Sequence, residues 1–136
     1  MRNFETTLLF KWFQQVWNEG NENAIDELFS VDGIAYGVAD EINIKGPEEF
    51  KSFYNGFRKQ FSNINVIVGD VISQDEVESA RCIVDAIHID SGKKVHFTGI
   101  CMAKISNGKI IEGWNNFDFL KMNQQIGLTL TNEASS

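Results

Sequence analysis

Cationic residues are scarce in this sequence. It has 12 lysines and arginines against 19 aspartates and glutamates, which gives a net charge of −7. Phosphate backbones and anionic membrane surfaces attract positive charge, so nucleic acid and membranes are unfavourable partners. Long apolar runs are also missing, and none approaches the roughly 20 residues of a membrane-spanning helix. Residues 1–5 lack a long apolar segment with a small-residue cleavage site, so we expect a cytoplasmic protein.

Cysteine and histidine are scarce too, with two of each. Cys82 and Cys101 lie in predicted strands at a spacing that matches no metal site. We predict that both are buried, reduced thiols, with a disulfide between them as the alternative. The sequence contains no nucleophile elbow, phosphate-binding loop or glycine-rich dinucleotide motif. We therefore expect no metal and no cofactor, and function has to be sought in a pocket.

Aromatic and aliphatic residues are plentiful by contrast. Hydrophobic residues make up 43% of the 136 residues and include eleven phenylalanines and three tryptophans. This length and composition predict one folded domain with a substantial core. We place the domain at residues 1–128 and a frayed C-terminal tail at residues 129–136.

Three segments have the period of amphipathic helices. Apolar residues recur every three or four positions in residues 3–18, and a shorter helix is predicted at residues 23–29. The single proline, Pro47, suits the first turn of a third helix. That helix carries one aromatic stripe, formed by Phe50, Phe53, Tyr54, Phe57 and Phe61. The stripe predicts core packing against a sheet, and the same side chains could also roof a ligand cavity.

The remainder reads as strands, at residues 63–73, 77–89, 95–105 and 110–119. Ser91-Gly92 and Asn107-Gly108 are tight-turn signals, which join the last three segments into an antiparallel meander. Helices followed by such strands predict an α+β fold, in which a curved antiparallel sheet wraps around the N-terminal helices.

Alternation along the last strands predicts which side chains face inward. Asn115 shares its parity with Ile111 and Phe117, so we expect it to point into the helix-covered interior. The opposite face carries Ile100, Met102 and Trp114 among polar residues. An apolar patch of this kind favours an oligomer interface, and we predict a homodimer through it.

Two residues are candidates for acid–base chemistry. Asp118 would become a general acid or base if a β-bulge turned it inward, although an exposed or capping aspartate at a strand end is the alternative. His88 shares a strand face with small apolar residues and could shuttle a proton, or it could be an ordinary core or rim histidine. The predicted ligand-binding residues are Asn115, Trp17, Tyr54, Phe53, Phe57, Phe97 and Phe117.

The order of several short motifs resembles a known family over residues 5–128. These motifs are Trp17-Asn18-Glu19-Gly20-Asn21, Ala24-Ile25-Asp26-Glu27-Leu28-Phe29, Asp32-Gly33, Gly46-Pro47-Glu48-Glu49-Phe50, Phe97-Thr98-Gly99, Gly108-Lys109-Ile110-Ile111-Glu112-Gly113-Trp114-Asn115 and Gln124-Gln125-Ile126-Gly127. Together they are similar to the SnoaL-like polyketide cyclases, within the superfamily that has the fold of nuclear transport factor two. The resemblance implies a cystatin-like α+β barrel, a cone with an internal pocket, and a dimer.

The resemblance also implies cofactor-free ring closure or isomerisation of a hydrophobic carbonyl compound, with an aspartate as the acid–base group. This sequence has Asn115 where many relatives have that aspartate. An asparagine exchanges no proton at neutral pH, so catalysis would pass to Asp118 or His88. The alternatives are a non-catalytic binding module for a small apolar ligand and a dimeric interaction domain.

Overall fold

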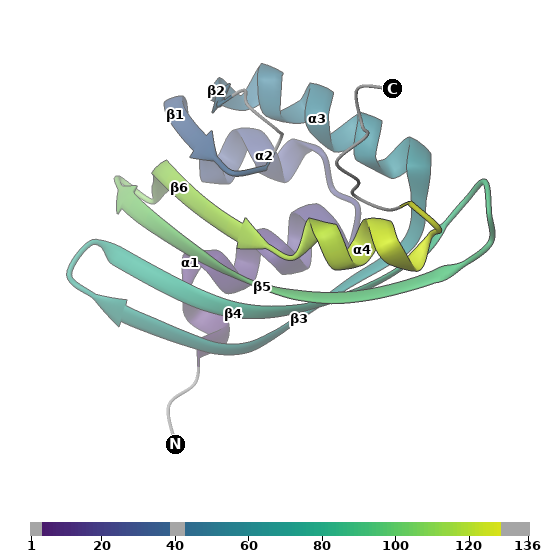
Figure 1. Cartoon of the computed structure of the whole chain (residues 1–136). Coiled ribbons are helices and arrows are strands. Elements are labelled where there is room, and N and C mark those ends of the chain that lie inside the picture. The colour runs from purple at the N-terminus through teal and green to yellow at the C-terminus, as the bar shows by residue number, and fades with distance from the viewer. Residues whose placement is uncertain (1–3, 39–42, 129–136) are drawn as a thin grey trace.

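The computed structural model describes residues 4–38 and 43–128 and has an α+β fold. Six strands form one curved sheet in the order β2-β1-β6-β5-β4-β3, and the helices cover its concave side (Figure 1). The sheet does not close on itself, because its end strands β2 and β3 are not paired with each other. In the described part of the chain, no helix is long and apolar enough to cross a membrane. The predicted tail, residues 129–136, lies outside the described residues.

The strands confirm the predicted meander and extend it by one strand. Their bounds are β1 Phe29–Tyr36, β2 Ile44–Lys45, β3 Phe61–Gln74, β4 Val77–His88, β5 Lys94–Ser106 and β6 Lys109–Phe117. Strands β3 to β6 pair antiparallel with their neighbours along the chain. The prediction of a wholly antiparallel sheet is wrong at one place, since β1 pairs parallel with β6. Helix α3 (Gly46–Gln60) and strands β2 to β5 separate these two strands along the chain, and turn signals do not reveal such a distant pairing.

The predicted N-terminal helix is broken into shorter pieces. A 3₁₀ turn, η1 (Phe4–Thr6), precedes α1 (Leu8–Lys11), which continues as a π-helix, η2 (Trp12–Asn18). Thr7 causes the first break because its side chain accepts a hydrogen bond from the amide of Phe10 at 3.3 Å and caps α1. The π-helix ends with the amide of Glu19 donating to the carbonyl of Gln14 at 2.9 Å, a bond across five residues.

The other predicted helices are confirmed closely. Helix α2 (Asn23–Leu28) is followed directly by β1, and α3 begins with Pro47 in its first turn. The aromatic stripe of α3 faces the sheet, with Phe50 and Tyr54 buried. Phe61 is buried as well, but it already belongs to β3.

Polar side chains attach the N-terminal helices to the sheet. Glu78 on β4 accepts hydrogen bonds from the amides of Leu8 and Leu9 at 3.2 and 2.8 Å, which satisfies two free donors at the start of α1. Asn18, at the end of η2, forms two hydrogen bonds with the backbone of Val66 on β3. Its Nδ2 donates to the Val66 carbonyl at 2.9 Å, and its Oδ1 accepts from the Val66 amide at 2.6 Å. These contacts fix both ends of the helical segment that carries Trp12 and Trp17 over the sheet.

Strand β6 differs from its prediction in register and in length. Lys104 of β5 pairs with Glu112, but Ile105 pairs with Ile110, so Ile111 is an extra residue in a β-bulge. The bulge turns Ile110 rather than Ile111 into the core, and alternation then runs through Gly113 and Asn115. The strand also ends at Phe117, where a short helix, α4 (Phe119–Gln125), begins instead of the predicted strand end.

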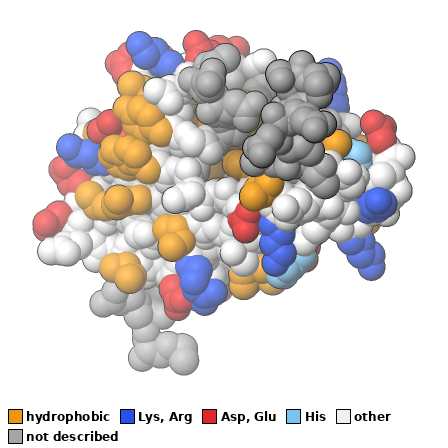
Figure 2. All heavy atoms as spheres, in the orientation of Figure 1, with side chains coloured by type: hydrophobic (Ala, Val, Ile, Leu, Met, Phe, Trp, Pro, Cys, Tyr) orange, Lys and Arg blue, Asp and Glu red, His pale blue; other side chains and the backbone are white. Residues whose placement is uncertain are grey.

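The outer face of the sheet carries exposed apolar side chains, as predicted. Ile100, Met102 and Trp114 are 55%, 42% and 39% exposed. Met102 pairs with Trp114 across β5 and β6, and the Tyr36 ring stacks on Trp114 with 5.7 Å between centroids. Figure 2 shows hydrophobic side chains gathered at the left of the view, where β1 and β6 lie in Figure 1.

Candidate functional site

A cavity of about 90 Å³ lies between the concave face of the sheet and the helices. Its lining comes from η2, α3, α4 and five strands, β1 and β3 to β6. The lining residues are Trp12, Phe13, Trp17, Phe29, Ala35, Val38, Phe50, Phe53, Phe57, Ile64, Val66, Val84, Phe97, Cys101, Ala103, Ile110, Gly113, Asn115, Phe117 and Phe119. Aromatic and aliphatic side chains dominate this lining, and among the described residues Asn115 contributes its one carboxamide.

The π-helix and α3 together place the aromatic wall. In η2 each hydrogen bond spans five residues, which brings Trp12 and Trp17 to the same side of the helix. Phe50 lies between them, with its ring 5.0 Å from that of Trp12 and 6.4 Å from that of Trp17. Phe53 and Phe57 extend the wall along α3, with their rings 6.2 and 5.7 Å from Trp17.

The floor of the cavity follows the alternation of β4 and β5. Val84 on β4 and Phe97, Cys101 and Ala103 on β5 point inward, and all four are buried. Burial raises the pKa of the Cys82 thiol to about 12, against a smaller opposing effect of Arg81, and it also raises the pKa of Cys101. Both cysteines are free, as predicted, and both stay neutral thiols at ordinary pH.

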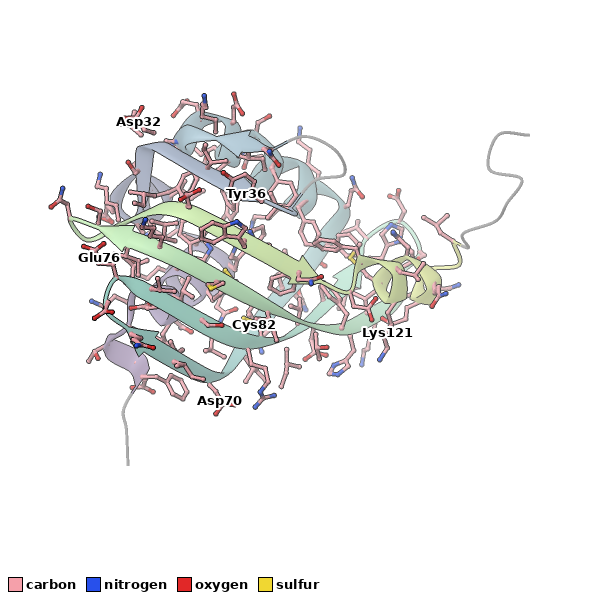
Figure 3. The ribbon with its side chains drawn as sticks, turned by 60° about the vertical axis from the view of Figure 1, so that its left-hand side comes forward. Asp32, Tyr36, Asp70, Glu76, Cys82 and Lys121 are labelled. Atoms are coloured by element: carbon pink, nitrogen blue, oxygen red, sulfur yellow. The ribbon has the colours of Figure 1, made fainter. Side chains whose placement is uncertain are left out.

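Asn115 points inward, as its parity indicated, and strand β1 holds its carboxamide. Its Nδ2 donates to the carbonyl of Tyr36 at 3.0 Å, next to the parallel pairing of Tyr36 with Trp114. Figure 3 looks onto the outer face of the sheet and labels Tyr36 near the end of β1, beside β6. Gly37 follows with a positive φ of +79°, and a Cβ there would overlap the backbone oxygen of Asn115. The glycine therefore allows β1 and β6 to approach closely where Asn115 is fixed.

Asp118 does not face the cavity. It is exposed, its Oδ1 caps α4 by accepting from the amide of Lys121 at 3.0 Å, and its own amide donates to the carbonyl of Thr98 at 3.0 Å. The bulge in β6 lies upstream at Ile111, so the alternation after it is undisturbed and Asp118 keeps the outward direction that its parity indicated. Asp118 borders a separate hollow of about 670 Å³ on the outer face, next to Ile100.

His88 and Tyr54 also lie outside the cavity lining. His88 ends β4, where its Nδ1 is 2.8 Å from Oγ of Ser91 and its ring is 5.3 Å from that of Phe61. Tyr54 is buried, and its hydroxyl donates to the carbonyl of Val16 at 2.9 Å. This bond attaches α3 to η2. The hydroxyl that was predicted to contact a ligand is therefore already bonded within the protein.

The structure thus brings together six of the seven predicted ligand-binding side chains. Asn115, Trp17, Phe53, Phe57, Phe97 and Phe117 line the cavity. The predicted ligand-binding residues do not include Trp12 and Phe13, although both share the apolar face of residues 3–18 with Trp17. They do not include Phe119 either, although in the predicted strand Phe119 has the same inward parity as Asn115 and Phe117. Within residues 4–38 and 43–128, no group of three or more His, Cys, Asp or Glu side chains is placed to hold a metal ion.

Solved structures with the same architecture come from several bacteria. A provisionally named polyketide cyclase from Bacillus cereus ATCC 10987 is 28% identical, with a TM-score of 0.75, and the match covers 85% of this chain and 75% of that one. IdmH from Streptomyces antibioticus, also provisionally named a polyketide cyclase, is 18% identical with a TM-score of 0.76, covering 89% and 96%.

A third structure names the fold. A hypothetical protein from Catenulispora acidiphila DSM 44928, solved in complex with trimethylamine, has a ketosteroid isomerase-like fold. It matches with a TM-score of 0.81 at 15% identity, covering 90% of this chain and 94% of that one. This confirms the predicted fold class.

The sequence itself supports a more specific assignment. No curated protein matches it significantly. The family model of the SnoaL-like polyketide cyclases, however, matches residues 7–126, which is nearly the whole of the described structure. The chain therefore belongs to the SnoaL-like polyketide cyclase family.

Proposed function

We propose that this protein binds one small, largely apolar molecule in the cavity beneath η2 and α3. The observation that carries the proposal is an aromatic-lined cavity with a single fixed carboxamide, that of Asn115. Binding sites for small molecules combine apolar walls with a few placed polar groups, and this lining has that composition.

The size of the cavity favours a ligand with a single ring. At about 90 Å³ it is of the same order as the roughly 150 Å³ apolar cavity that accepts benzene. It is well below the roughly 300–1,000 Å³ of sites for drug-sized ligands. A polyketide of several fused rings would require large movements of the Phe and Trp side chains, whereas one ring requires small ones.

The chemistry of the lining favours binding over acid–base catalysis. The polar groups of the described lining residues are the Asn115 carboxamide, the Cys101 thiol, whose pKa burial raises, and the indole N–H groups of Trp12 and Trp17. None of these groups exchanges protons readily near neutral pH. Asp118 caps α4 on the outside, and His88 is bonded to Ser91. Membership in a cyclase family is the argument for the alternative, a cofactor-free cyclase that acts on a carbonyl compound.

A matched pair of variants on β3 tests binding in this cavity. Val66 lines the cavity, whereas the next residue, Ile67, points outward and is 49% exposed. A single-ring probe such as p-cresol at about 100 times its Kd is expected to stabilise the native protein by about 2.7 kcal/mol, or roughly 5–10 °C. Val66→Phe, which fills the cavity, removes this shift, and Ile67→Phe keeps it.

Differential scanning fluorimetry measures both shifts, and circular dichroism confirms that each variant is folded. An undiminished shift in folded Val66→Phe would place the ligand elsewhere and contradict the proposal. Turnover of a hydrophobic carbonyl compound that Asp118→Ala abolishes, with the fold intact, would instead favour the cyclase.

We further propose that the protein forms a homodimer through the outer face of the sheet. Ile100, Met102 and Trp114 form a contiguous exposed apolar surface there. The same face carries paired charges of both signs, since Lys104 lies beside Glu112 across β5 and β6. A two-fold symmetric interface brings a face against a copy of itself, and a face with both apolar side chains and charges of both signs suits that arrangement.

Charge introduced at the centre of this face should separate the subunits. Trp114→Glu or Ile100→Glu would place unpaired carboxylates in the apolar interface, so each variant is expected to elute as a monomer in size-exclusion chromatography with light scattering. Val31→Glu is the matched control, because Val31 is 75% exposed at the start of β1. A wild-type protein of monomeric mass, or dimers that persist in both variants, would contradict this interface.

A further inference from the structure

We infer that the molecule bound in the cavity carries a hydrogen-bond donor, a phenolic or alcoholic hydroxyl, that donates to Oδ1 of Asn115. This inference rests on the proposed binding function and narrows its ligand class. It depends on which atom of the Asn115 carboxamide, Nδ2 or Oδ1, is available to a ligand. Strand β1 determines this, because its Tyr36 carbonyl accepts a hydrogen bond from Nδ2.

The orientation of the Asn115 amide is fixed by the Tyr36 carbonyl. Nδ2 donates to that carbonyl oxygen at 3.0 Å. The flipped amide would bring Oδ1 against the same carbonyl oxygen, and two acceptors repel each other. Gly37 holds the carbonyl in place, because its positive φ and its close approach to the backbone of Asn115 fix the end of β1.

Among the residues that the structure describes, Oδ1 is therefore the end of the carboxamide without a hydrogen-bond partner. Within the described residues it accepts no hydrogen bond, whereas Nδ2 has the Tyr36 carbonyl. It is also not sealed inside the protein, since no fully buried side-chain oxygen or nitrogen of the described residues lacks a partner. Asn115 lines the cavity, so a molecule there can reach an acceptor to which no described residue donates.

The surroundings of Asn115 make this acceptor selective. Phe117, Ala35 and Ile110 are apolar members of the same lining, and they offer a ligand hydroxyl no competing partner. A polar group that enters an apolar cavity without a hydrogen bond is strongly disfavoured. A hydroxyl that donates to Oδ1 avoids this cost, whereas a carbonyl oxygen facing Oδ1 does not.

Three probes of nearly equal size test the inference on the whole protein. p-Cresol carries a donor, p-xylene replaces the hydroxyl by a methyl group, and p-tolualdehyde carries only an acceptor. Their Kd values are measured by isothermal titration calorimetry for the wild type, for Asn115→Leu and, in case the leucine variant does not fold, for Asn115→Ala. The Kd of each probe is divided by that of p-xylene for the same protein. The different hydrophobicities of the probes then cancel when this ratio is compared between the wild type and a variant.

Loss of Oδ1 should weaken the binding of p-cresol more than that of the other two probes. The affinity of p-cresol relative to p-xylene is expected to fall about five- to tenfold in the variants, as for the loss of one hydrogen bond. The affinity of p-tolualdehyde relative to p-xylene stays within about twofold. An unchanged p-cresol ratio, or a selective loss of p-tolualdehyde binding, would overturn the inference but not the proposed function. Failure of all three probes to bind the wild type would overturn both.

Discussion

Gly37→Ala is expected to lower the free energy of unfolding by about 3 kcal/mol or more. Gly37 has a φ of +79°, a conformation that alanine adopts only with strain. The added Cβ would also overlap the backbone oxygen of Asn115, so β1 and β6 would have to separate at this point. Urea denaturation, read as a lower midpoint at an unchanged m value, measures the loss.

Gly56→Ala is the matched control for this change. Gly56 lies inside α3 with no atom within 4 Å of an added Cβ, so alanine there should raise the stability by roughly 0.5–1 kcal/mol. The two substitutions are chemically identical and are expected to have opposite signs. A Gly37→Ala protein as stable as the wild type would show that the end of β1 does not lie as close to the backbone of Asn115 as described.

Alkaline pH is expected to destabilise the protein strongly through its buried thiols. Burial raises the pKa of Cys82 from 9.0 to about 12, and it raises that of Cys101 as well. The folded state keeps each thiol neutral while the unfolded state ionises. The stability they contribute is therefore complete below pH 9 and is lost as the pH rises from 9 towards 12. For Cys82 alone the loss at pH 11 is about 2.7 kcal/mol.

A double variant isolates this effect from other groups that titrate at high pH. Cys82→Ala with Cys101→Ala removes both thiols and keeps every lysine and tyrosine. The free energy of unfolding, measured in urea from pH 8 to pH 11, should fall more steeply for the wild type than for the double variant. Parallel curves for the two proteins would mean that the thiols are not buried as the structure describes.

Local patterns were sufficient to predict most of the fold. The stripe on α3 and the turns at Ser91-Gly92 and Asn107-Gly108 depend on neighbouring residues, and the structure confirms them. The parallel pairing of β1 with β6 could not be predicted in this way, because it joins Tyr36 to Trp114 across most of the chain. The sequence periodicity also concealed the break at Thr7, where one side-chain hydrogen bond decides where the helix begins.

The candidate site was predictable where alternation was regular and not where it was interrupted. Asn115 and Phe117 lie inward, as parity indicated, because they follow the bulge rather than span it. Parity predicted that Ile111 points inward, but Ile110 does so in the structure. The reason is the bulge, which adds a residue to the strand without leaving a mark in the composition. Helix α4, which Asp118 caps, was not predicted, because its seven residues carry little periodic signal.

A methyl NMR titration of the wild type with p-cresol shows directly whether a small apolar molecule binds in this cavity. The methyl groups of Val66, Val84 and Ala103, which line the cavity, are expected to shift with one common Kd. Those of Ile67 and Ile72, which are exposed on the outer face, stay in place. Shifts confined to Ile100 and Leu120, beside the outer hollow, or no saturable shifts at all, would contradict binding in this cavity.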